Sequence, residues 1–149
     1  MWLSTKLRPA YSVQIMQRSF GIPPSLEEMQ QLAQAALAGL PAPFAAHLGG
    51  IRLLVEDFAD EDALAELGID DPFELTGLYE GLPLGDKSID HSGAMPDRIR
   101  LFRRPILDEW AERGDVTLEQ LVTHVLVHEV GHHFGLSDEA MHALEEQAG

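Results

Sequence analysis

Residues 128–141 combine imidazoles and carboxylates at a spacing that suits a metal ion. The stretch reads HEVGHHFGLSDEAM. His128 and His132 lie four residues apart, so on a helix with 3.6 residues per turn both project from one face, one turn apart. Two imidazoles at that separation can both reach one Zn²⁺ ion. The spacing therefore predicts that His128 and His132 are zinc ligands. The alternative is that they are hydrogen-bonded residues of the core.

Glu129 follows the first of these histidines and is predicted to act on water rather than on the metal. It lies about 100° round the helix, too far to be a natural third ligand on the same face. From there a carboxylate can take a proton from metal-bound water, which is the general-base role in the pattern H-E-x-x-H. Shuffling this composition gives roughly 0.03 such matches by chance, and about 0.003 once Gly135 is also required. The extended pattern is therefore the stronger indication.

A third ligand is predicted just beyond the end of this helix. Gly135 can adopt the positive φ with which a helix ends, so the chain can turn back there. Asp138 comes ten residues after the first histidine and offers a carboxylate oxygen suited to the third position. The alternative is that Ser137, Asp138 and Glu139 only cap the next helix. In that case Glu139 or His142 would supply the third ligand.

The helix that carries the motif is predicted to begin after Thr117 and to run to about Phe134. Thr117-Leu-Glu-Gln is a capping box, and Gly135 marks the end. Apolar residues lie all round the helix, which predicts that it is buried on every side within the fold. These residues are Leu121, Val122, Val125, Leu126 and Val130.

Of three other residues near this helix or the predicted sheet, two have two open interpretations. His124 lies one turn before His128 and is predicted either to support the metal site or to be packed or exposed. His133 is predicted to point away from the ligand face. Tyr79 is predicted either to pack in the core or to lend a phenol to an oxyanion.

The remaining pattern predicts an α+β domain in which a small mixed sheet packs against helices. The expected elements are a helix from the capping box at Ser25 to Gly39, a strand over 50–56, an acidic helix over 60–67, a strand over 75–81, a polar loop over 81–90, a half-buried strand over 98–103, a helix from Pro105 to Gly114, and a last helix ending near Gln147.

The composition indicates one globular domain. The chain has 149 residues, of which 45% are hydrophobic and 23% are charged. We expect residues 1–23 to be an untethered leader and residues 24–149 to be the domain. The chain has no cysteine, so disulfides and thiolate ligands are excluded and a metal must be held by His, Asp or Glu.

The charge of the chain disfavours two classes of partner. A formal net charge of −15 repels nucleic acid backbones and anionic membranes. The basic cluster of Arg98, Arg100, Arg103 and Arg104 is short and faces many carboxylates. No apolar run reaches the length that spans a membrane. We therefore expect a cytoplasmic protein, monomeric by default, without nucleic acid or membrane partners.

The motifs resemble those of a known family. HEVGHHFGLSD resembles the zincin pattern H-E-x-x-H-x-x-G-x-x-[H/D], and GLYEGLPL, MPDRIRLFRRPI and HHFGLSDEAM are similar to the small bacterial "minimal zincin" metallopeptidases, over roughly Pro24 to Gln147. The resemblance implies a zincin-like fold in which a mixed sheet packs against an active-site helix. It also implies Zn²⁺ on His128, His132 and Asp138, with Glu129 as catalytic base.

Two features depart from the larger enzymes of matrix-metalloprotease type. Their third ligand is usually His, whereas this chain has Asp138. Their Met-turn lies downstream, and the eleven residues after Asp138 leave no room for one.

The function predicted from the sequence is a zinc-dependent endopeptidase of low activity on short or unfolded peptides. The alternative is a non-catalytic domain in which zinc is structural. Glu129 separates the two, because a structural site has no need of a carboxylate beside its first ligand.

Overall fold

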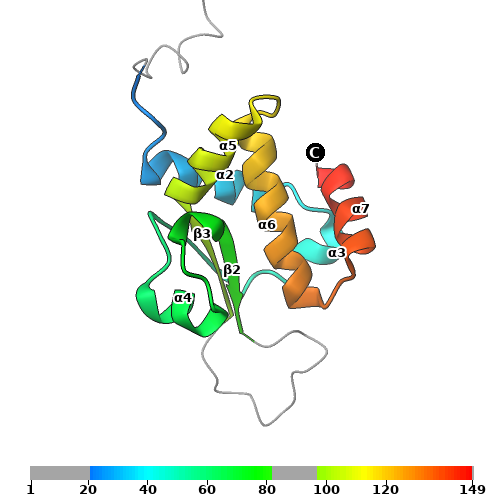
Figure 1. Cartoon of the computed structure of the whole chain (residues 1–149). Helices are drawn as coiled ribbons and strands as arrows, with labels where there is room; N and C mark the ends of the chain where they lie inside the picture. The colour runs from blue at the N-terminus through cyan, green and yellow to red at the C-terminus, as the bar shows by residue number, and fades with distance from the viewer. Residues whose placement is uncertain (1–20, 82–96, 149) are drawn as a thin grey trace, which may run out of the picture.

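The computed structural model describes residues 21–81 and 97–148 (Figure 1). The elements are α2 (Leu26–Ala38), α3 (Ala42–Ala45), β1 (Arg52–Glu56), α4 (Glu61–Leu67), the 3₁₀-helix η2 (Pro72–Glu74), β2 (Gly77–Glu80), β3 (Arg98–Phe102), α5 (Arg103–Arg113), α6 (Leu118–Phe134) and α7 (Asp138–Ala148). Residues 1–20 of the expected leader and residues 82–90 of the expected loop lie outside the described residues.

The strands form a small mixed sheet in the order β1-β3-β2. β1 is parallel to β3, with Leu53 opposite Ile99, and β2 is antiparallel to β3, with Tyr79 opposite Ile99. Helices pack against this sheet, which confirms the α+β class expected from the sequence.

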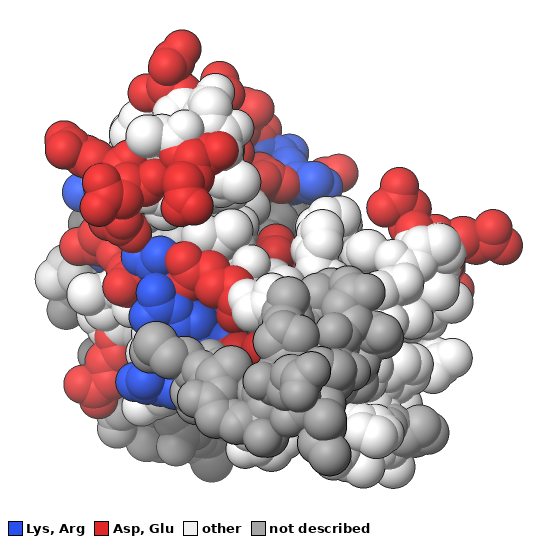
Figure 2. Space-filling view, turned by 90° about the horizontal axis from the view of Figure 1, so that it is seen from below, with Lys and Arg blue, Asp and Glu red and all other residues white. Residues whose placement is uncertain are grey.

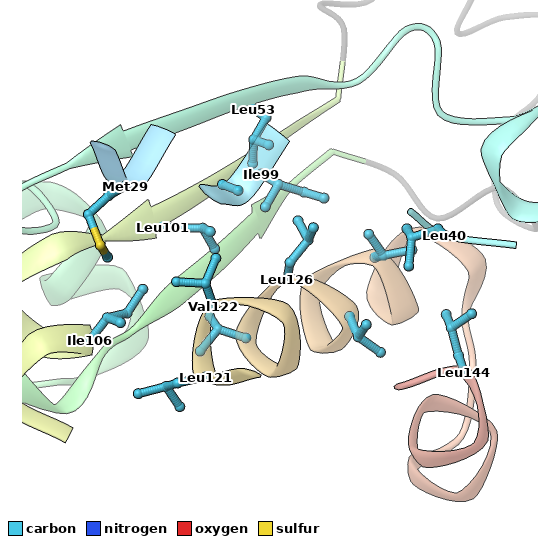
Figure 3. Close-up of a cluster of buried hydrophobic side chains, with 14 of the residues drawn as sticks. Met29, Leu40, Leu53, Ile99, Leu101, Ile106, Leu121, Val122, Leu126 and Leu144 are labelled. Carbon is cyan, nitrogen blue, oxygen red and sulfur yellow. The ribbon is translucent and has the colours of Figure 1, made fainter. Parts of the chain in front are cut away.

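The main core lies between one face of the sheet and helices α2 and α6. Figure 3 shows Leu53, Ile99 and Leu101 of the strands near Val122 and Leu126 of α6. All five side chains are buried. Because side chains alternate across a strand, the apolar residues at positions 99 and 101 of β3 share the face that α6 covers. This packing fixes α6 against β2 and β3.

A smaller core lies on the other side of β3. Phe102 is fully buried there against Ala59 and Ala63, and half-buried Leu64 and Leu78 pack around them. Helix α4 contributes Ala63 and Leu64, so it covers the face of the sheet opposite α6. The sheet is therefore covered on both faces.

The expectation that β3 is a half-buried strand is wrong, because β3 is the central strand of the sheet. Arg100 is only 6% exposed, and its guanidinium lies 2.8 Å from Glu56 and 2.7 Å from Asp60. Glu80 lies 3.3 Å away on the other side. Burial opposes the charge, but the carboxylates of Asp60 and Glu56 outweigh it and hold the pKa of Arg100 above its usual value. Arg100 is therefore a buried cation that carboxylates at the edge of the sheet surround, whereas Arg98 remains partly exposed.

The sequence predicted most helix ends correctly. Both capping boxes are present, at Ser25 and at Thr117, and Gly68 and Gly114 end their helices in the left-handed conformation. Helix α5 begins at Arg103, two residues before the expected start at Pro105. A proline in the first turn costs no hydrogen bond, so the chain can enter the helix earlier. The short elements α3 and η2 were not predicted.

Acidic side chains outnumber basic ones on the face of the domain seen in Figure 2. Figure 2 shows Asp and Glu gathered beside the few arginines, in keeping with the ion pairs of Arg100 and with the pair of Arg103 and Asp57. Among the described helices, none is long and apolar enough to cross a membrane.

Candidate active site

Helix α6 presents its histidines on an exposed face. The helix is mostly buried, as expected, but the expectation that it is buried all round is wrong. His124, His128 and His132, at successive intervals of four residues, are exposed. Val122, Leu126 and Val130 cover the opposite side and are almost fully buried, so the three histidines lie on the side of α6 that faces away from the sheet.

His128 and His132 stand next to each other as the spacing predicts. Their ring centroids are 5.3 Å apart and the rings meet edge to face at 78°. Burial lowers the pKa of His132, and the nearby His128 lowers it further, while Asp138 acts in the opposite direction. Both imidazoles are exposed and able to present a lone pair to a shared metal ion.

Asp138 is the first residue of α7 and is exposed. The cap of this helix is its neighbour, because the Oγ of Ser137 accepts the N–H of Ala140 at 3.1 Å. Among the capping candidates that the sequence left open, the bond therefore identifies Ser137. Asp138 is close enough to His132 to affect its pKa, and with His128 it lines a pocket of about 210 Å³ between α6 and α7.

The donor types at this end of α6 fit a zinc ion. Two imidazoles and one carboxylate are a common catalytic zinc set. Within residues 21–81 and 97–148, no three His, Asp or Glu side chains already surround a common point. His128 and His132 are in ring contact, however, and exposed Asp138 lines the same pocket as His128.

Glu129 directly follows His128 on α6 but is buried, whereas both histidines are exposed. It is only 7% exposed, and this burial raises its pKa to about 7, against the opposing effect of the backbone N–H of Tyr79. A carboxyl with that pKa exchanges a proton easily at neutral pH, as a general acid–base group must.

A buried polar cluster next to Glu129 was missed by the sequence analysis. The hydroxyl of Tyr79 donates to the Oδ2 of Asp97 at 2.9 Å and lies 3.2 Å from the Nδ1 of His133. His133 Nδ1 is in turn 3.0 Å from Asp97 Oδ2. The expectation that His133 faces away from the ligand face is confirmed. The phenol of Tyr79 is engaged in this cluster. The spacing of Glu129 and His133, four residues apart on α6, was a usable signal.

The other histidines within residues 21–81 and 97–148 have partners or neighbours of their own. His124 Nδ1 lies 2.8 Å from Glu145 on α7, and His142 lies 3.0 Å from Glu146 one turn further along its own helix. His47 meets Phe134 edge to face. His124 therefore links α6 to α7 beside the pocket, one of the two interpretations left open.

Comparisons with known proteins support the resemblance seen in the sequence. A comparison with curated proteins gives no match. A family model described as zincin-like metallopeptidase matches residues 48–148, a span that includes the whole sheet, α6 and α7. Because the match covers more than half of the chain, it confirms the resemblance: the chain belongs to the family of zincin-like metallopeptidases.

Proposed function

We propose that this chain is a zinc-dependent peptidase in which His128, His132 and Asp138 hold Zn²⁺ and Glu129 is the general base. Membership in the zincin-like metallopeptidases implies zinc and peptidase chemistry in general. The observation that carries the specific proposal is the pairing of a buried carboxyl, of raised pKa, with two adjacent exposed imidazoles.

The metal ligands and Glu129 have different roles in the proposed hydrolysis of a peptide bond. Zinc, when bound, polarises the scissile carbonyl and acidifies the attacking water. Glu129 accepts the proton of that water and then donates it to the leaving amine. Its pKa of about 7 suits both directions of transfer near neutral pH. Because its side chain is buried, Glu129 meets the reacting atoms from the protein side while the substrate arrives from solvent.

Short or unfolded peptides are the proposed substrates. The three proposed ligands are exposed, and the pocket beside His128 and Asp138 has a volume of only about 210 Å³. A site of this kind buries little of its substrate, so little binding energy is available to orient it. Slow turnover follows.

The alternative of a purely structural zinc has less support. Helix α7 already packs on α6 through buried Met141 and Leu144, so the two helices do not depend on a metal to stay together. A structural site also gives no reason to bury Glu129, whose charged form is costly there.

The test is metal analysis of untagged protein together with hydrolysis of a denatured protein pool, with and without a chelator. We expect about one zinc per chain, and hydrolysis that the chelator abolishes and added zinc restores. Full zinc occupancy without hydrolysis of any peptide would favour the structural alternative. Hydrolysis that persists after the metal has been removed would contradict the proposal.

A further inference from the structure

Strand β2 presents a glycine, a tyrosine and a glycine at alternate positions toward α6. Gly77 and Tyr79 lie on one face of the strand, and Gly81 continues the alternation just past its end. Leu78, between them, packs into the smaller core on the opposite face of the sheet. The face that meets α6 therefore carries one large side chain between two positions without a Cβ.

Each glycine makes room for a carboxylate. A Cβ at position 77 would stand 3.2 Å from both the Cγ and the Oε2 of Glu129, and 2.8 Å from a methyl group of Val125. A Cβ at position 81 would stand 2.2 Å from the Oδ1 of Asp97. Glu129 and Asp97 therefore approach the strand on either side of Tyr79.

Tyr79 bonds both of these carboxylates. Its backbone N–H donates to Glu129, and its hydroxyl donates to Asp97 at 2.9 Å. Phe102 N–H donates to Thr76 across the antiparallel ladder, and bonded pairs alternate along such a ladder. The N–H of Tyr79 therefore points away from β3 and toward α6.

The phenol also contacts the helix that carries Glu129. His133 Nδ1 lies 3.2 Å from the hydroxyl of Tyr79, and His133 follows Glu129 by one helical turn. Tyr79 thus holds α6 at two successive turns, by its main chain at Glu129 and by its side chain at His133.

We propose that Tyr79 is a positioning residue for Glu129. Its phenol, held by Asp97 and His133, fixes the strand so that its N–H keeps the Glu129 carboxylate beside the histidine pair. A carboxylate has two oxygens, so a bond to one leaves the other for proton transfer. The kinetic consequence rests on the proposed peptidase function, whereas the positioning itself does not.

The direct test is Tyr79→Phe, which keeps the ring and the N–H but removes the hydroxyl. In zinc-loaded protein we expect kcat to fall about tenfold, with KM and zinc affinity within about twofold of the parent, since misplacement of a catalytic group acts on the chemical step. The matched control is Trp110→Phe, which removes another ring hydrogen bond, the 3.0 Å bond to the carbonyl of Val116, far from the motif. We expect this control to leave kcat unchanged.

A second variant disturbs the Glu129 carboxylate without changing Tyr79. Gly77→Ala keeps the phenol and its partners but places a methyl group against Glu129. We expect the same loss of kcat without loss of zinc. An unchanged kcat in both variants, or a loss that Trp110→Phe reproduces, would overturn the proposal.

A third measurement does not depend on peptidase activity. It is the hydrogen-exchange rate of the backbone amide at position 79, followed by NMR on the zinc-free protein. We expect protection in the parent and at least about tenfold faster exchange in Tyr79→Phe, with no change in Trp110→Phe. If the parent hydrolyses no peptide, the proposed function fails, and this rate alone decides the positioning. An exchange rate unaffected by Tyr79→Phe would overturn the inference even in an active enzyme.

Discussion

Met141 of α7 packs directly against Gly131 of α6. A Cβ at position 131 would stand 2.4 Å from the sulfur of Met141, so only glycine allows the two helices to approach this closely. The contact matters for the site because Asp138 lies one turn before Met141 on α7. The glycine within H-E-V-G-H thereby sets the distance between the third proposed ligand and the first two.

Gly131→Ala should destabilise the protein and weaken zinc binding together. The overpacking costs about 1–3 kcal/mol, partly offset by the better helix propensity of alanine, roughly 1 kcal/mol. Denaturant unfolding and zinc titration measure the two effects. Adding Met141→Ala should relieve the clash, so the double variant should bind zinc better than Gly131→Ala alone. If Gly131→Ala leaves the zinc affinity unchanged, α7 does not position a ligand.

Substitutions at Asp138 and Ser137 should distinguish zinc ligation from helix capping, because the first changes zinc affinity and the second changes stability. Ser137→Ala should cost about 1 kcal/mol of stability and leave zinc affinity unchanged, because it removes only the cap. Asp138→Ala should do the reverse, lowering zinc affinity by about 100-fold or more with little change in the zinc-free melting temperature. Asp138→His should retain binding, because imidazole also suits zinc. If Asp138→Ala binds zinc as the parent does, the third ligand must be sought at Glu139 or His142.

The unfolding free energy of the zinc-free protein should depend on pH because of Glu129. Its folded pKa of about 7 lies above the ordinary value of 4.5, so the folded state holds a proton that the unfolded state has lost between these values. The contribution is complete below about pH 4.5 and disappears as the pH rises through 7, an effect of about 3 kcal/mol. The contribution of Glu129 is measured as the difference, at each pH, between the unfolding free energies of the parent and of Glu129→Gln. A difference that is flat between pH 4.5 and 7 would argue against a buried, protonated Glu129.

Arg100 should be far more important to stability than an exposed arginine. Arg100→Ala removes the buried cation that Glu56, Asp60 and Glu80 share, and because these carboxylates are themselves partly exposed, the loss of stability comes mainly from the lost packing and ion pairs of Arg100. The matched control is Arg113→Ala, which removes the exposed pair with Glu109 and should change stability little. If the two substitutions have equal effects on urea unfolding, the claim that buried Arg100 matters more than an exposed arginine is contradicted.

The sequence predicted those parts of the fold that local rules decide. Capping residues and left-handed glycines act on their own helix, so the ends at Ser25, Gly68, Thr117 and Gly135 were predicted correctly. The burial of β3 was not, because the place of a strand within a sheet depends on residues distant in sequence. Arg100 looks like a surface residue until Glu56, Asp60 and Glu80 are brought around it.

The same division holds for the site. The spacing of His128 and His132 predicts their contact, since both lie on one helix. Tyr79, Asp97 and His133 come from three separate parts of the chain, so no local pattern joins them. Their cluster depends on how β2 packs against α6, and Gly77 and Gly81 reveal that packing only once the strand and helix are placed.

Hydrolysis of a peptide pool by zinc-loaded Glu129→Gln is the most direct test of the central claim. The substitution keeps the shape of the side chain and removes its ability to accept a proton. The matched control is Glu119→Gln, an exposed carboxylate in the first turn of the same helix. The account predicts that both variants retain zinc, that Glu119→Gln is as active as the parent, and that Glu129→Gln loses roughly 10²-fold or more in kcat. If Glu129→Gln with full zinc hydrolyses the pool as fast as the parent, Glu129 is not the general base and the proposed mechanism is contradicted.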